Sequence, residues 1–167
     1  MSMSYTGAQL SAMTALAIYA SAADGHIDEC EKKVILGHLA VFVPDETKRA
    51  KLIDAALALT LSYNDAVAIV RTMSMSQKRH FCAFIALIIL VDGNITNREM
   101  EFWTILTAHA DLPLMSLEQA VKILADENGI RYPSQQSSAS GNSGCCLVIA
   151  VLLILVMIIT MSVSYLA

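Results

Sequence analysis

The chain has 167 residues, of which 56% are hydrophobic and 16% are charged, and its formal net charge is −4 at pH 7. This length accommodates one ordinary domain with an appendage rather than two large domains. The acidic balance argues against nucleic acid as a partner, as do lysines and arginines that are scattered without interleaved aromatic residues. The four cysteines lack the spacing of a zinc site, which favours a reducing compartment.

The pattern of apolar residues predicts an all-α fold of about seven helices, because helical spacing recurs and no alternation with a period of two indicates a strand. The apolar stretch from Leu10 to Ala23 ends like a signal peptide, but no cationic residue precedes Lys32, so we interpret it as the first helix. A second helix, capped by Asp28, is expected to end at Pro44.

The later helices follow from caps and stops. We expect them at Asp45 to Thr60, after a cap at Asn64, from a cap at Ser76 to Val91, at Asn97 to about Ala110, and at Leu117 to Asn128 with Gly129 as its stop. The segment FCAFIALIILV in the fifth predicted helix is apolar on almost every side. We therefore expect that helix to be the most buried one, with Phe102 and Trp103 also in the core.

Two segments resemble each other and predict a duplicated helical hairpin. The first reads IYASAADGHIDECEKKVILGHLAVF and the second ALIILVDGNITNREMEFWTILTAHA. Each contains an apolar helix, a turn of the form D-G-x-I-x-x-x-E and an amphipathic helix. The turn matches the second half of a calcium-binding EF-hand loop, but the positions of the leading oxygen ligands hold apolar residues. A stand-alone EF-hand is therefore excluded.

The turn motif has two interpretations. In the first, it is purely structural: Gly25 and Gly93 permit a positive φ, and Asp28 or Thr96 caps the following helix. In the second, the duplication brings the two turns together, and their carboxylates hold a divalent cation such as Ca²⁺ or Mg²⁺. The candidate metal ligands are Asp24, Asp28, Glu31, Asp92 and Glu99.

The strings AADGHIDECE and LVDGNITNRE resemble the paired motifs of the TerB-like (tellurite-resistance TerB) family. The resemblance covers roughly residues 9 to 129, and its specific part is the D-G-x-I-x-x-x-E signature. It implies an all-α domain of two pseudo-symmetric hairpins, acidic residues proposed to bind metal, and a role in bacterial stress response, often near membranes. Thr96 and Asn97 replace possible acids in the second copy, which argues against two bound cations. Resistance to tellurite itself does not follow.

The last part of the chain predicts a membrane anchor. Every charged residue lies at or before Arg131, and residues 147–167 form an apolar run. About twenty apolar residues span the hydrocarbon layer of a bilayer. We therefore expect a helical domain at residues 1–130, a polar flexible linker at 131–144 and a single transmembrane tail anchor at 145–167, with the N-terminal domain in the cytoplasm. Cys145 and Cys146, at the start of the tail, fit either S-acylation or ordinary small helix residues.

No sequence motif indicates catalysis. The four histidines share no metal-binding spacing, and there is no nucleophile elbow or phosphate-binding glycine loop. The expected function is thus a non-enzymatic, membrane-tethered TerB-like interaction module with protein partners. The alternative is a metal-dependent hydrolase or a metal-sequestering protein that uses the acidic cluster.

Overall fold

The computed structural model describes residues 3–25 and 27–127, and within these ranges it contains seven α-helices and no strand. In chain order they are α1 (Gly7–Ser21), α2 (Glu29–Phe42), α3 (Glu46–Leu57), α4 (Tyr63–Arg71), α5 (Met75–Leu90), α6 (Asn97–His109) and α7 (Leu117–Glu127). The all-α prediction is confirmed. The predicted linker and tail anchor lie outside the described residues. Within the described part, no helix is both long and apolar enough to cross a membrane.

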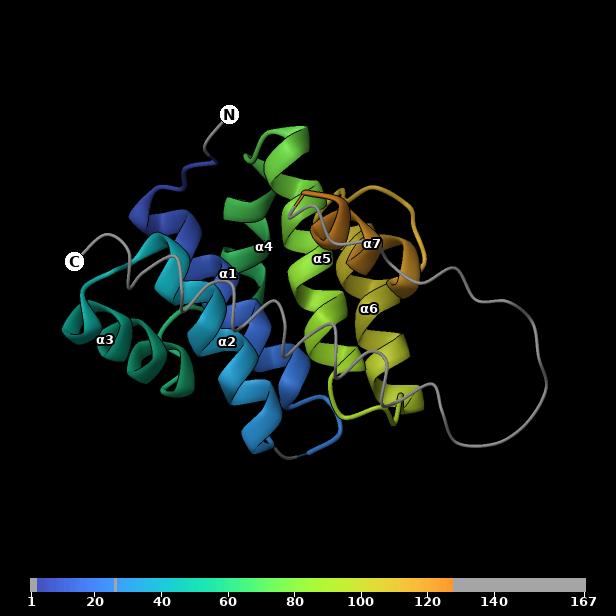
Figure 1. The fold of residues 1–167 in the computed structure, drawn as a ribbon, viewed down its shortest axis with the longest axis horizontal. Helices are drawn as coiled ribbons and strands as arrows, with labels where there is room; N and C mark the ends of the chain where they lie inside the picture. Colours follow the sequence, from blue (N-terminus) through green and yellow to red (C-terminus); the bar gives the residue numbers. More distant parts are fainter. Residues whose placement is uncertain (1–2, 26, 128–167) are drawn as a thin grey trace.

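Helix α5 forms the centre of the fold, as the sequence predicted. Every residue from Phe81 to Ile89 is at most 8% exposed. Helices α1, α2 and α7 pack directly against α5 (Figure 1), and α6 packs against α1. Trp103 of α6 is also buried, which confirms its predicted place in the core, whereas Phe102 is partly buried and packs against the core. Burying large apolar side chains of this kind contributes about 1.5–3 kcal/mol each.

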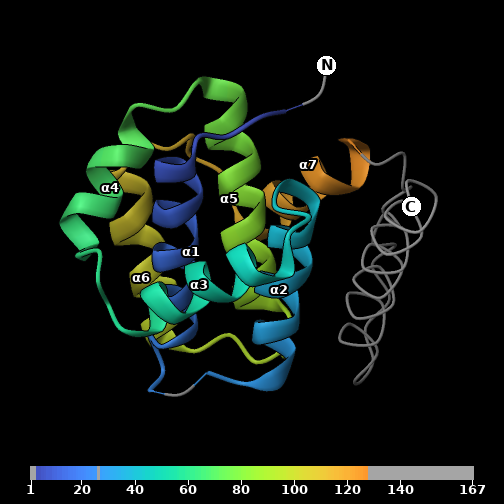
Figure 2. The same cartoon turned by 90° about the vertical axis from the view of Figure 1, so that its left-hand side faces the viewer.

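Helix α1 is the second buried helix of the bundle and contacts helices on several of its sides. It packs against α3 and α4 as well as α5 and α2, and Figure 2 shows it between α4 and α5, behind α3. Apolar and small residues cover most of its circumference, and Leu16 and Ala17 are fully buried. The stretch that resembled a signal peptide is therefore a core helix of the described domain.

Helix caps were predicted correctly where the sequence offered one choice. The reciprocal bonds of a capping box are present at Asp28 with Glu31 and at Thr96 with Glu99. The same pair of bonds joins Ser116 and Gln119. These bonds satisfy backbone N–H groups that have no partner inside the helix.

Two other predicted caps were wrong by two residues. Helix α4 is capped by Ser62 rather than Asn64, and α5 by Ser74 rather than Ser76. Both observed caps have an extended backbone, and each accepts a hydrogen bond from the N–H three residues later. Asn64 and Ser76 already lie inside the first helical turn, where a side chain cannot perform this role.

The end of α3 was also predicted too late. The helix stops at Leu57, and Leu59 adopts a left-handed φ of +50°. The N–H of Thr60 then donates to the carbonyl of Ala55 at 3.1 Å. This is the Schellman closure, in which a left-handed residue after the helix satisfies its last carbonyls. Glycine usually occupies that position, so the leucine gave no stop signal.

The corrected cap of α5 can be tested by substitution. Ser74→Ala removes the hydroxyl that accepts from the Gln77 N–H, and we expect it to lower the free energy of unfolding by about 1 kcal/mol. Ser76→Ala is the matched control and should change stability by less than about 0.5 kcal/mol. Denaturant unfolding of both variants measures the difference. A larger loss at Ser76 than at Ser74 would contradict the assignment.

Candidate functional site

The two D-G-x-I-x-x-x-E turns lie at the same end of the bundle. One joins α1 to α2 and the other joins α5 to α6, and both views place them together at the bottom of the molecule (Figure 1, Figure 2). Gly25 and Gly93 have φ values of +110° and +75°, as the motif predicted. Other residues rarely adopt these values, so glycine sets the shape of each turn.

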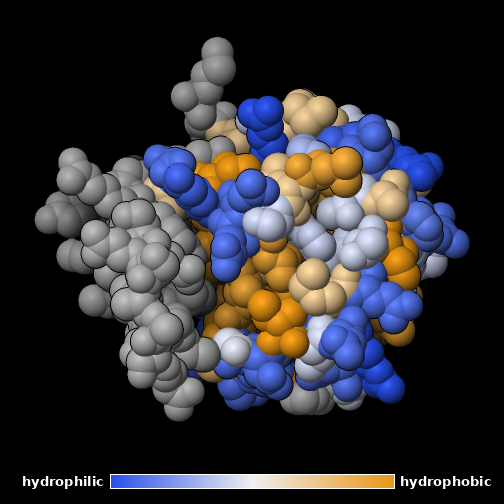
Figure 3. All heavy atoms as spheres, turned by 90° about the vertical axis from the view of Figure 1, so that its right-hand side faces the viewer, coloured by the Kyte–Doolittle hydropathy of each residue, from blue (hydrophilic) through white to orange (hydrophobic). Residues whose placement is uncertain are grey.

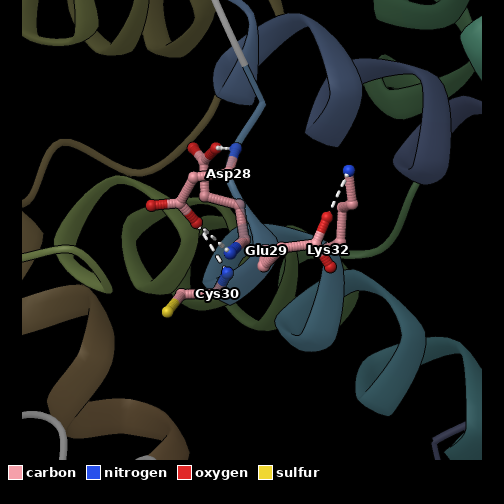
Figure 4. Close-up of polar contacts among 5 residues, drawn as sticks. Asp28, Glu29, Cys30 and Lys32 are labelled. Carbon is pink, nitrogen blue, oxygen red and sulfur yellow. Dashed lines mark hydrogen bonds and ion pairs between the residues drawn. The ribbon is translucent and has the colours of Figure 1, made fainter.

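In the first turn, the predicted ligands cap helix α2. Asp28 accepts hydrogen bonds from the backbone N–H groups of Cys30 at 2.6 Å and Glu31 at 2.9 Å. The Oε2 atom of Glu31 in turn accepts from the Asp28 N–H at 2.8 Å. Figure 4 shows Asp28 folded onto the helix start, whereas Glu29 and Lys32 pair on the exposed side. Each carboxyl group has a second oxygen that these capping bonds do not use.

Glu31 lies in an environment that disfavours its negative charge. Its side chain is buried, and this burial raises the pKa of Glu31 from an ordinary value of 4.5 to about 7. The N–H of Asp28 opposes this rise, whereas the negative charges of Asp28 and Asp24 add to it. The carboxylates of Asp24 and Asp28 therefore both act on Glu31 in the first turn.

Sequence reasoning missed Ser21, the last residue of α1. Its hydroxyl is near enough to Glu31 to favour the charged carboxylate weakly, yet no described atom lies in hydrogen-bonding geometry with it. We therefore count Ser21 as a polar neighbour of Glu31 and not as a hydrogen-bond partner. A signal was available in the repeat, because the second copy has the apolar Ile89 at the equivalent position.

The second turn is built in the same way but carries fewer acids. The Oε2 atom of Glu99 accepts from both the N–H and the hydroxyl of Thr96, at 2.7 and 2.8 Å. Asp92 accepts from the N–H of Asn94 at 2.9 Å, which is a common turn-stabilising bond. Because Thr96 stands where the first turn has Asp28, the first turn has the higher density of negative charge.

The hydrogen bonds of the two turns agree with the first interpretation of the motif, in which it is a purely structural turn. Four of the five predicted ligands, Asp28, Glu31, Asp92 and Glu99, bond to the backbone of their own turn. Among residues 3–25 and 27–127, no group of three or more His, Cys, Asp and Glu side chains is placed to hold a metal ion. His26, in the first turn, lies outside the described residues. The shared cation site remains a prediction.

The raised pKa of Glu31 predicts a dependence of stability on pH. Because the folded state binds this proton more tightly than the unfolded chain does, the stabilisation is fully present below about pH 4.5 and is lost as the pH rises through about 7. Glu31→Gln keeps the cap and removes the titration. Between pH 4.5 and 8, the parent should lose on the order of 2–3 kcal/mol relative to this variant.

Denaturant unfolding at several pH values measures this difference. Glu46→Gln, in the exposed first turn of α3, controls for the loss of one negative charge elsewhere. A difference between the parent and Glu31→Gln that stays constant from pH 4.5 to 8 would contradict the assignment.

Comparison with known proteins shows a fold but no family. No family model matches the sequence, and no curated protein matches it. The structure is similar to the crystal structure of a protein of unknown function from Porphyromonas gingivalis, with a TM-score of 0.64 and 24% sequence identity. The match covers 74% of this chain and 92% of that one. At this level of identity, the likeness establishes a shared helical fold alone.

Proposed function

We propose that this chain is a membrane-tethered, non-enzymatic interaction module of the TerB-like kind, which binds a divalent cation at its acidic turns and works in a bacterial stress-response assembly. The observation that carries the proposal is the burial of Glu31 beside Asp24 and Asp28 at one end of the bundle. Buried charges that repel one another cost free energy unless an opposite charge compensates them.

A hard divalent cation would provide that compensation. Ca²⁺ and Mg²⁺ prefer carboxylate and carbonyl oxygens, and the capping bonds leave one oxygen of Asp28 and one of Glu31 unused. Asp24 would complete the set in the first turn, and Asp92 and Glu99 would contribute from the second if the turns approach. One cation suits the unequal charges of the two turns better than two.

The surface of the domain offers apolar side chains to partners. Figure 3 shows an apolar area in the middle of the face on which α6 and α7 lie. Exposed apolar residues of α6 and the loop after it include Met100, Ile105 and Leu114, the last of which is 92% exposed. Apolar patches of this kind commonly mark contacts with other proteins. Their presence supports an interaction module over an enzyme.

The membrane tether rests on the apolar run at residues 147–167. A tethered domain meets membrane-bound partners at a raised effective concentration without any new contact. The polar residues at 132–144 would set how far the domain can reach from the bilayer.

The tether predicts how the protein fractionates. Full-length protein should sediment with membranes during ultracentrifugation and resist extraction with carbonate, because a transmembrane helix leaves the bilayer only with detergent. A chain ending at residue 144 is the control and should stay in the supernatant. Full-length protein found in the supernatant would refute the tether and would leave the cation site untouched.

The cation site predicts measurable binding. Detergent-solubilised full-length protein should bind Ca²⁺ or Mg²⁺ in a calorimetric titration, and the double variant Asp24→Asn and Asp92→Asn should lose that binding. Asp54→Asn with Asp126→Asn removes the same charge from exposed positions of α3 and α7 and should bind as the parent does.

The outcomes of the titration separate the candidate functions. No heat above buffer would refute cation binding, and unchanged binding in the turn variant would place the site elsewhere. Hydrolysis of a phosphate ester that requires the same carboxylates would favour the metal-dependent hydrolase over the interaction module.

A further inference from the structure

A cluster of histidine and aromatic side chains lies at the other end of the bundle from the acidic turns. Tyr5 comes from the segment before α1, His38 from α2 and His80 from α5. The His38 and His80 ring centroids lie 5.1 Å apart, with their planes 31° from each other. Phe42 and Phe84 surround the pair, and the ring of His38 stacks on Phe84 at 3.7 Å. The phenyl rings of Phe42 and Phe84 carry no charge, so they place the two histidines in an apolar environment.

A chain of hydrogen bonds orients His80. The hydroxyl of Tyr5 lies 2.8 Å from Nδ1 of His80 and donates to the sulfur of Met3 at 2.9 Å. In the tautomer that carries its proton on Nδ1, His80 donates to the Tyr5 oxygen, and the phenolic proton is then directed to the Met3 sulfur. The lone pair of the neutral ring then lies on Nε2. A histidine that ligates a metal is held in the same way, by donating its other N–H to a neighbouring group.

His38 supplies a buried nitrogen without a partner. Its Nε2 atom is inaccessible to solvent and has no hydrogen-bond partner among the described residues. Leaving such a group unsatisfied costs about 1–3 kcal/mol, so it calls for a physical explanation. Burial lowers the pKa of His38 well below 6.5, and burial lowers the pKa of His80 to about 4. The apolar rings packed against both histidines favour the neutral imidazole, which is the form that binds a metal.

We propose that His38 and His80 bind a single copper(I) ion, with Tyr5 as the residue that positions His80. Two nitrogens that share one ion lie about 4 Å apart, twice a bond of ~2 Å, and a centroid separation of 5.1 Å allows this for facing ring edges. All the donors of the cluster are neutral, which favours a monovalent ion, because a divalent ion would remain uncompensated among apolar rings. Imidazole and thioether ligands suit copper(I), and the sulfur of Met3 lies beside Tyr5.

This site is independent of the acidic turns. His80 and Asp92 are separated by twelve residues along α5 and its end, which corresponds to roughly 18 Å at helical rise. The two sites also differ in ligand type, with nitrogen at one end and oxygen at the other. Failure of either metal proposal therefore leaves the other standing.

The test is an anaerobic competition for copper(I) between full-length protein in detergent and the chromophoric chelator bicinchoninate. Thiols also bind copper(I), so every protein compared carries the same background substitutions, Cys30→Ser, Cys82→Ala, Cys145→Ser and Cys146→Ser. This background protein should withdraw one equivalent of copper(I). His38→Phe and His80→Phe, which preserve an aromatic ring, should each lose that equivalent, whereas His109→Asn should keep it.

Tyr5→Phe provides a second test that leaves the core histidines in place. We expect the same stoichiometry with an affinity 10–100-fold lower, as for other groups that orient a metal-bound histidine. If the histidine variants fail to fold by circular dichroism, this shift decides the question. The proposal is overturned if the background protein withdraws no copper(I), if folded histidine variants bind as well as their parent, or if Tyr5→Phe leaves the affinity unchanged. Zinc(II) bound at these histidines in preference to copper(I) would equally overturn it.

Discussion

The fold depends on the need to cover a helix that is apolar all round. Between Phe81 and Ile89, α5 has no side that water could contact without cost, so other helices must pack around it. Helices α1, α2 and α7 do so directly. Because such a helix is apolar on all sides, its own sequence does not set its rotation about the helix axis. The amphipathic helices that pack around it determine which side faces which neighbour. Local capping then fixes where each neighbour begins.

Much of this architecture could be predicted from the sequence. The all-helical class, the central helix and the turns at Gly25 and Gly93 follow from apolar spacing and from glycine's tolerance of positive φ. Boundaries were less certain where two capping residues compete within one turn, as Ser74 and Ser76 do. Capping preference cannot distinguish two serines. The cap is the serine whose own backbone is extended where the chain enters the helix.

The candidate sites were only partly predictable, for a different reason. The acidic turns could be identified because each forms within a few residues of the chain, and their capping bonds are local. Tyr5 and His80 are separated by 75 residues, and their contact depends on how the first segment crosses α2 and α5. Rules based on the spacing of residues along the sequence cannot detect a contact between residues so far apart. The histidines were therefore interpreted as unrelated, and the role of Ser21 as a neighbour of Glu31 was missed.

The packing of α7 on α5 has a mechanical consequence. The chain leaves the described domain after Glu127, at the end of α7, and α7 lies directly against α5. Any pull on the chain beyond this point therefore enters the domain through a helix docked on its centre. Leu117, Val121 and Leu124 of α7 are all buried, so displacing α7 would expose several apolar side chains together. The end of α7 is therefore coupled directly to the most buried helix of the described residues.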